Sequence, residues 1–141
     1  MILNSGLCSS FKRELLEGLH DFLNDAFRLA LYSAQANLSV DTTTRYASDG
    51  EISGPGYLAG GRVLTGVQVL GPASRVAFVT WDDAVWPDSQ LVARGGLIYN
   101  ETASQRAVAV LNFQTDRSSN TGEFRVQLPP PTPSTALIRI A

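Results

Sequence analysis

The sequence of 141 residues has few of the side chains that staple a small domain or equip it with a metal. It contains one cysteine, one histidine and one methionine. A single cysteine, Cys8, excludes a disulfide within the chain, and one histidine beside one cysteine cannot supply the nitrogen and sulfur ligands of a structural zinc. We therefore expect no metal and no cofactor, and a fold that is held by its own apolar core.

An excess of charge of one sign is also missing. Eleven basic residues stand against thirteen acidic ones, which gives a formal net charge of -2 at pH 7. A nucleic-acid-binding surface needs clustered positive charge, so we expect no nucleic-acid partner. No apolar run approaches the roughly 20 residues of a membrane span. The first residues lack the basic start of a secretory signal, so we expect neither a membrane partner nor such a signal.

Lysine is nearly absent, because Lys12 is the only one and the other ten basic residues are arginines. Arginine offers a planar fork of donors and suits protein interfaces better than lysine does. Two explanations stay open: a bias in the composition of the genome, or a surface made for protein contact.

The composition and the apolar periodicity of the sequence indicate a folded, mainly β chain. Hydrophobic residues make up 44% of it and charged residues 17%, which is too apolar for a disordered tail. Residues 11–24 have the 3.6-residue repeat of an amphipathic helix. Its expected apolar stripe consists of Phe11, Leu15, Leu19, Phe22 and Leu23. Ser9 or Ser10 can cap the start of this helix, and Gly18 lies inside it at a cost of up to about 1 kcal/mol.

After residue 25 the apolar period changes to two, which is typical of strands with one face on a core. The expected strands cover residues 26–33, 63–70, 75–81, 91–99, 106–113, 123–128 and 136–140. Glycine, proline and asparagine turns separate them, and Gly95 and Gly96 predict a kink or a close backbone approach. The pattern predicts one domain: an antiparallel β-sandwich or barrel-like body over residues 26–141, with one N-terminal amphipathic helix. Residues 1–10 form an expected arm and residues 34–62 a long ordered loop.

Few residues suggest catalysis. His20 is the sole histidine, and the turn that exposes a nucleophilic serine between a strand and a helix is absent. We interpret His20 as a structural or interfacial residue and Cys8 as a small apolar filler. We therefore expect no catalytic residues and a protein that is not an enzyme.

One acidic segment leaves several interpretations open. Asp82, Asp83 and Asp88 follow an expected strand and are interpreted first as a solvated turn. Loop carboxylates also bind calcium, although the spacing does not match an EF-hand. Asp82 and Asp83 are the acid and base that a hydrolase would use. Trp86 and Tyr57 offer aromatic faces for a sugar, or anchors for a protein partner.

Five segments carry a resemblance to a known class of proteins. They are FKRELLEGLHDF (11–22), FRLALY (27–32), EISGPGYLAGG (51–61), ARGGLIYN (93–100) and ALIRIA (136–141). In order and spacing these segments resemble small structural proteins of tailed bacteriophages, over nearly the whole chain and without a catalytic motif.

The resemblance implies a virion component of the capsid decoration or cement type, made in the host cytoplasm and bound to the capsid surface. Its implied partners are the major capsid protein and further copies of itself, as a dimer or a trimer. Two alternatives stay open, a tail or fibre adaptor and a carbohydrate-binding module. The expected contact elements are the helix, the 41–61 loop and the acidic turn. The residues expected to contact a partner are Phe11, Leu15, Tyr57, Arg62, Trp86 and Arg94.

Overall fold

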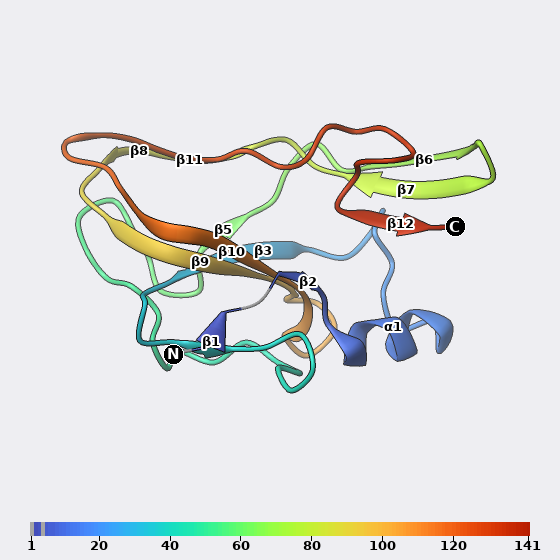
Figure 1. Ribbon diagram of the computed structural model, residues 1–141, viewed down its shortest axis with the longest axis horizontal. Coiled ribbons are helices and arrows are strands. Elements are labelled where there is room, and N and C mark those ends of the chain that lie inside the picture. The colour runs from blue at the N-terminus through green and yellow to red at the C-terminus, as the bar shows by residue number, and fades with distance from the viewer. Residues whose placement is uncertain (1, 4) are drawn as a thin grey trace.

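The computed structural model describes residues 2–3 and 5–141 and shows a mainly β protein with a single short helix in that part of the chain (Figure 1). The elements in chain order are β1 (Ile2–Leu3), β2 (Gly6–Leu7), α1 (Ser9–Leu16), β3 (Phe27–Tyr32), β4 (Asn37–Leu38), β5 (Arg62–Val63), β6 (Gln68–Ala73), β7 (Val76–Thr80), β8 (Ala84–Ser89), β9 (Val92–Asn100), β10 (Arg106–Ser118), β11 (Gly122–Val126) and β12 (Ile138–Ile140). The prediction of a mainly β, antiparallel, sandwich-like domain is confirmed.

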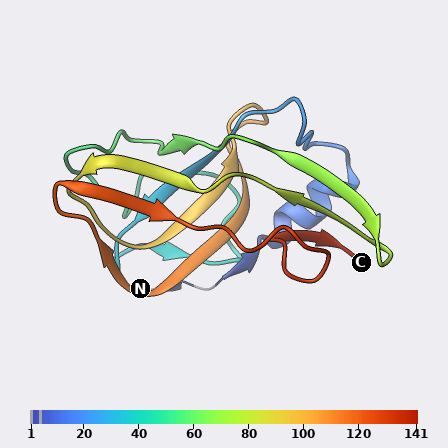
Figure 2. The same ribbon diagram turned by 90° about the horizontal axis from the view of Figure 1, so that it is seen from above.

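The strands form two layers. One layer is a five-stranded antiparallel sheet in the order β2-β10-β9-β3-β5. The other combines the ribbon β11-β8 with the sheet β12-β7-β6, and Figures 1 and 2 show these strands lying across one face of the larger sheet. The short parallel pair β1-β4 lies apart from this second layer.

Aromatic rings fill the space between the two layers. Trp81 is the first residue after β7, and its ring packs against that of Phe27, with the ring centroids 5.5 Å apart. The Trp86 ring of β8 lies 6.2 Å from the ring of Tyr57 and 6.1 Å from that of Phe124. Both tryptophans are buried. Trp81 joins the second layer to β3 of the five-stranded sheet, and Trp86 joins it to the 34–62 loop.

The helix is shorter than the predicted 11–24 because Gly18 ends it. Gly18 has a left-handed φ of 75°, which glycine adopts without a steric penalty. The Gly18 amide donates to the Leu15 carbonyl and the Leu19 amide to the Glu14 carbonyl, the bonds of a Schellman C-cap. The predicted stripe is therefore split: Phe11 and Phe22 are buried, Leu15 is half-buried, and Leu19 and Leu23 are exposed.

The N-terminal residues do not form the expected separate arm 1–10. Gly6 and Leu7 pair with β10 at Val110 and Ala109, and β1 pairs with β4. Residues 1 and 4 of that predicted arm lie outside the described residues. The pairing of β2 adds a fifth strand to the larger sheet, so this segment belongs to the domain itself.

The acidic segment is also different from the prediction, because part of it is strand β8. Trp86 pairs with Phe124 and Ser89 with Gly122, while Pro87 and Asp88 lie in a register shift between the two pairs. Proline cannot donate to a ladder and is tolerated in a strand at such irregular positions. Pro87 and the aspartates indicated a turn and concealed the strand.

Glycines divide or tighten other expected strands. The predicted strand 63–70 is divided into β5 and β6, and Gly66 lies between them with a φ of 69°. Gly96 of β9 pairs with Leu31 in an unbroken register, so no kink occurs there. A Cβ at Gly96 would lie 2.9 Å from Leu29 Cδ1, which confirms the close approach.

Candidate functional site

The only histidine lies in a buried polar cluster behind the helix. His20 Nε2 lies 2.9 Å from Glu14 Oε1, and His20 Nδ1 lies 3.1 Å from Asn100 Nδ2. Asn100 also donates to Asp25 Oδ2 at 2.8 Å, and Arg106 donates to Glu14 Oε2 at 3.1 Å. The His20 side chain is fully buried. These contacts tie α1 and the segment after it to β9 and β10, and they satisfy polar groups whose burial would otherwise cost free energy.

Cys8 has no nucleophilic character in this setting. Its side chain is fully buried at the start of α1. Burial, and secondarily the charge of Glu14, raises the pKa of the Cys8 thiol to about 12. Because the thiolate is the reactive form, Cys8 is unreactive at neutral pH.

The acidic segment is held by structural contacts. Asp83 Oδ2 lies 3.2 Å from an Arg125 nitrogen, and Asp83 Oδ1 accepts the Leu128 amide at 3.1 Å. The Asp82 amide donates to the Thr65 carbonyl at 2.9 Å. Within residues 2–3 and 5–141, no group of three or more histidine, cysteine, aspartate or glutamate side chains could hold a metal ion. Asp83 thus joins β8 to the segment after β11.

The long loop 34–62 is fastened by one carboxylate. Glu51 accepts bonds of 2.5 Å from the hydroxyls of Tyr46 and Tyr57 and one of 2.8 Å from the Gly60 amide. Tyr99 of β9 donates its hydroxyl to the Gly60 carbonyl at 2.6 Å. Burial raises the pKa of Tyr99 to about 12 and raises the pKa of Tyr46 and Tyr57 as well. The tyrosines therefore stay protonated donors at neutral pH.

The structure corrects half of the residues expected to contact a partner. Phe11, Tyr57 and Trp86 are buried, with exposed fractions of 0%, 8% and 3%. Their rings belong to the core, so they offer neither a partner anchor nor a sugar-binding platform. The other three reach the surface in different places. Leu15 is half-buried and Arg62 of β5 is exposed, whereas Arg94 of β9 is half-buried and lies 3.5 Å from Asp116.

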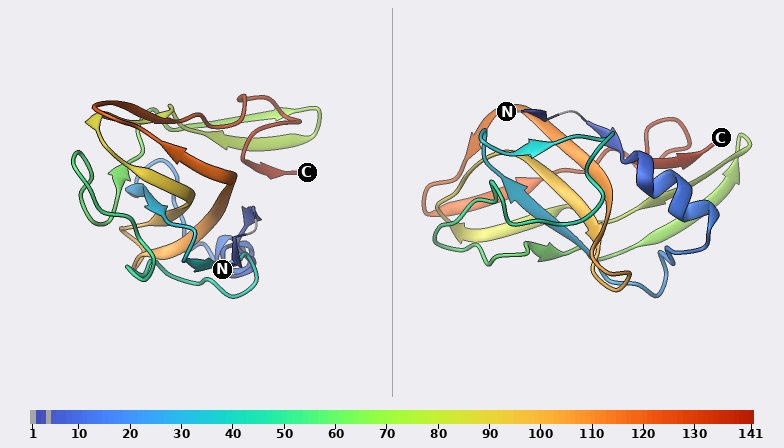
Figure 3. Two further views of the ribbon diagram at one scale, coloured as in Figure 1. Left: turned by 60° about the vertical axis from the view of Figure 1, so that its left-hand side comes forward. Right: turned by 90° about the horizontal axis from the view of Figure 1, so that it is seen from below.

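A first surface feature is an apolar groove between α1 and the β6-β7-β12 sheet. Figure 3 shows α1 below these strands, at the end of the molecule away from the β10–β11 hairpin. The groove has a volume of about 170 Å³, and every side chain that lines it is apolar: Leu15, Phe22, Val69, Ala77, Phe78, Val79, Ile138 and Ile140. Val69 and Ile140 are about half exposed, and Leu16 of α1 is 90% exposed. We call this surface the α1 groove.

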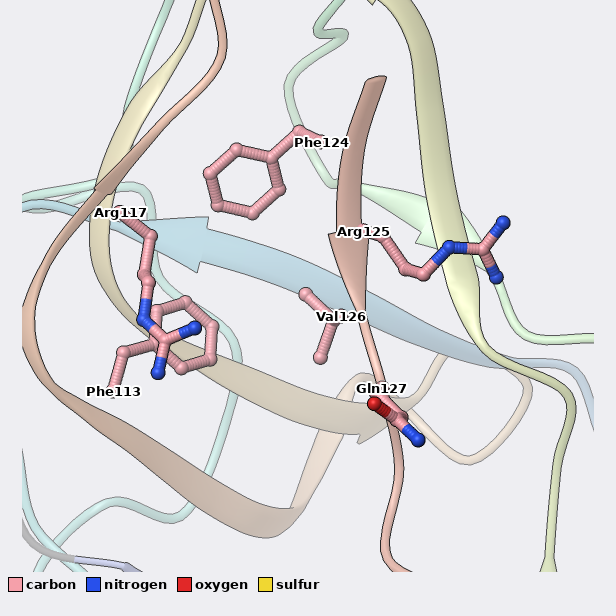
Figure 4. A pocket seen from close by; sticks show the side chains of 6 residues that line it. All are labelled: Phe113, Arg117, Phe124, Arg125, Val126 and Gln127. Carbon is pink, nitrogen blue, oxygen red and sulfur yellow. The ribbon is translucent and has the colours of Figure 1, made fainter.

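A second surface feature is a pocket between β10 and β11, with a volume of about 350 Å³. Its lining residues are Phe113, Arg117, Phe124, Arg125, Val126 and Gln127. Figure 4 shows Phe113 and Arg117 from β10 facing the space that Phe124 and Val126 enter from β11, with Arg125 on the other side of β11. We call it the Arg117 pocket.

The sequence predicts only part of the α1 groove and no part of the Arg117 pocket. Leu15 and Phe22 were part of the predicted stripe. The pocket arises because β10 leaves its register with β9 between Asn112 and Arg117, where Gln114 has a φ of 68°. Such a bulge has no sequence signal here, because Gln114 is neither glycine nor asparagine.

Comparison with family models, with curated proteins and with solved structures finds no match to this chain. In the part of the chain that the structure describes, no helix has the length and apolarity needed to cross a bilayer.

Proposed function

We propose that this chain is a non-enzymatic structural protein of a phage virion, a decoration or cement protein that binds the shell of the major capsid protein. The observation that carries this proposal is the α1 groove. Apolar side chains that gather at one surface and stay exposed are typical of a protein interface. The sequence resemblance to small phage structural proteins supplies the class of partner.

The polar clusters support a binding role over a catalytic one. The only histidine is buried and bonded to Glu14 and Asn100, and Asp83 pairs with Arg125. Cys8 is buried as a neutral thiol. The histidine and the thiol are therefore not presented at the surface, where a substrate would meet them.

The edges of the smaller sheet are suited to self-association. In the described chain, β12 and β6 form the two edges of the β12-β7-β6 sheet. An edge strand offers unpaired backbone groups to another chain. We propose a closed homo-oligomer, a dimer or a trimer, in which these edges and the α1 groove supply the contacts between copies or with the shell.

Charged substitutions in the α1 groove test this proposal. Val69 and Ile140 line the groove and are about half exposed. Val69→Asp and Ile140→Asp place a carboxylate in an interface that must exclude water, so each should reduce the binding of purified protein to capsids that lack it at least tenfold. The measurement is cosedimentation with capsids of the phage that encodes the chain.

Val92→Asp is the matched control, because Val92 is 55% exposed and lies in β9, outside the α1 groove and outside the expected contact elements. It should bind as the unaltered protein does. Equal binding by all four proteins would overturn the role of the groove. Binding to isolated tails but not to capsids would favour the adaptor alternative.

A further inference from the structure

We infer that the Arg117 pocket binds a carboxylate carried on an apolar or aromatic group. The pocket is separate from the α1 groove, and the inference goes beyond the proposed function. It depends on one unpaired arginine that faces a wall of aromatic and aliphatic side chains.

The shape and lining of the pocket suit a small organic group. Its volume of about 350 Å³ lies at the lower end of the range of ligand sites, about 300–1,000 Å³. Phe124 and Val126 are buried at its base, and Phe113 is half-buried at its side. Ligand sites have this composition: an apolar wall with a small number of polar groups that fix orientation.

The charges identify Arg117 as the recognition group. Arg125 is already paired, with Glu123 at 2.7 Å and Asp83 at 3.2 Å. Among the residues that the structure describes, the Arg117 guanidinium has neither an ion-pair nor a hydrogen-bond partner, and the neighbouring Asp116 pairs with Arg94. Arg117 therefore keeps all five N–H donors of its guanidinium for a ligand.

A carboxylate fits these donors better than other anions do. The guanidinium fork binds both oxygens of a planar carboxylate at once. One unpaired arginine supplies one positive charge, which matches a monoanion and leaves part of a dianionic phosphate uncompensated. The phenylalanine rings require that the carboxylate be attached to an apolar body, because a fully hydrated anion would gain nothing from them.

Titration with 3-phenylpropionate tests the inference, followed by the amide resonances of residues 113–117 and 124–127 in an NMR spectrum. We expect saturable shifts in both segments. The neutral isostere 3-phenylpropanamide should bind at least tenfold more weakly, because it lacks the charge that Arg117 pairs with. A tenfold loss corresponds to about 1.4 kcal/mol.

Two variants measure separately what the arginine and the apolar wall contribute to binding. Arg117→Gln should weaken 3-phenylpropionate at least tenfold, and Phe113→Ala should weaken both the acid and the amide. Arg62→Gln is the matched control, because Arg62 is an exposed arginine on β5, at the far edge of the five-stranded sheet from β10 and β2. Unsaturable shifts, equal affinity for acid and amide, or equal losses in the two arginine variants would overturn the inference.

A peptide ending in phenylalanine distinguishes the two sources of such a carboxylate. If the tetrapeptide Gly-Gly-Gly-Phe binds more tightly than 3-phenylpropionate, the ligand is the C-terminus of a protein chain. If 3-phenylpropionate binds as well or better, the ligand is a free small acid. Both results support the inference, and neither depends on capsid binding, so its failure is separate from failure of the proposed function.

Discussion

At the scale of single residues, the carboxylates that are withdrawn from solvent have several hydrogen-bond or ion-pair partners each. Glu14 is the buried carboxylate of α1, and it has both His20 and Arg106 as partners. Glu51 is a half-buried residue of the long loop 34–62 and accepts three bonds. A buried charge without partners costs several kcal/mol, so these two residues stabilise the fold only together with their partners.

Removal of the Glu51 carboxylate should loosen the long loop. Glu51→Ala leaves the Tyr46 and Tyr57 hydroxyls and the Gly60 amide without their acceptor, and we expect a loss of about 2–4 kcal/mol in the free energy of unfolding. Glu51→Gln keeps one acceptor oxygen and should cost less. Urea unfolding followed by tryptophan fluorescence measures both.

Glu17→Ala is the control for Glu51, because Glu17 is exposed and forms only a surface pair with Arg13 at 3.7 Å. Its effect should stay below about 0.5 kcal/mol. If Glu51→Ala were no more destabilising than Glu17→Ala, the carboxylate would not fasten the loop.

At the scale of elements, the sequence predicts those strands whose alternation is undisturbed. The predicted strands 26–33, 75–81 and 106–113 correspond to β3, β7 and the first part of β10. Strand β8 was missed because Pro87 and three aspartates indicate a turn, although a bulge accommodates the proline. The sandwich could be predicted, but the partners of each strand depend on contacts between distant segments.

The length of the helix also depends on more than the local apolar pattern. Periodicity alone extended it to residue 24, because Leu19, Phe22 and Leu23 continue the apolar spacing. The left-handed Gly18 ended it instead, and this turned Phe22 into the core and left Leu19 and Leu23 exposed. The α1 groove depends on this turn. The Arg117 pocket depends on a register shift, which local sequence patterns do not contain.

Two glycine substitutions distinguish the cost of a left-handed φ from the cost of a steric collision of the added Cβ. Gly18→Ala adds a Cβ that meets nothing within 4 Å, so only the left-handed φ of 75° is penalised, at about 1–2 kcal/mol. Gly61→Ala adds a Cβ that would collide with the Leu29 carbonyl oxygen, so β3 must move as well.

We therefore expect Gly61→Ala to lower the free energy of unfolding by clearly more than Gly18→Ala, as measured by thermal and urea unfolding. Circular dichroism of Gly18→Ala should show at most a small change in helix content. Equal losses in the two variants would contradict the close approach of the 34–62 loop to β3.

At the scale of the whole molecule, aromatic rings pack together at one end, whereas an apolar groove is exposed at the other. Tyr57, Trp86 and Phe124 pack between the layers at the β8–β11 ribbon. At the other end an apolar groove lies between the β12-β7-β6 sheet and α1. Figure 1 shows β7 and β12 above this helix. This asymmetry suits a protein that attaches by one end.

The buried cysteine and tyrosine side chains should make the folded protein less stable at high pH. Burial raises the pKa of Cys8 and Tyr99 to about 12 and raises the pKa of Tyr32 and Tyr57. The unfolded chain therefore loses these protons first, starting near the ordinary cysteine pKa of 9.0. Stability should be fully present below about pH 9 and fall progressively as the pH rises toward 12.

Urea midpoints measured from pH 7 to pH 11 follow this loss. Tyr99→Phe removes one of the titrating hydroxyls, so its midpoint should depend less steeply on pH above 10, even if it is lower at pH 7. Midpoints that stay constant up to pH 11 in the unaltered protein would contradict the burial of these groups as neutral species.

We propose that this chain works by attachment to a capsid shell. Cryo-electron microscopy of mature particles from the proposed phage source of the chain tests this proposal most directly. We predict density for the two-layered β domain on the outer shell, with α1 and the β12-β7-β6 sheet toward the major capsid protein. Particles that lack the chain altogether would contradict the account.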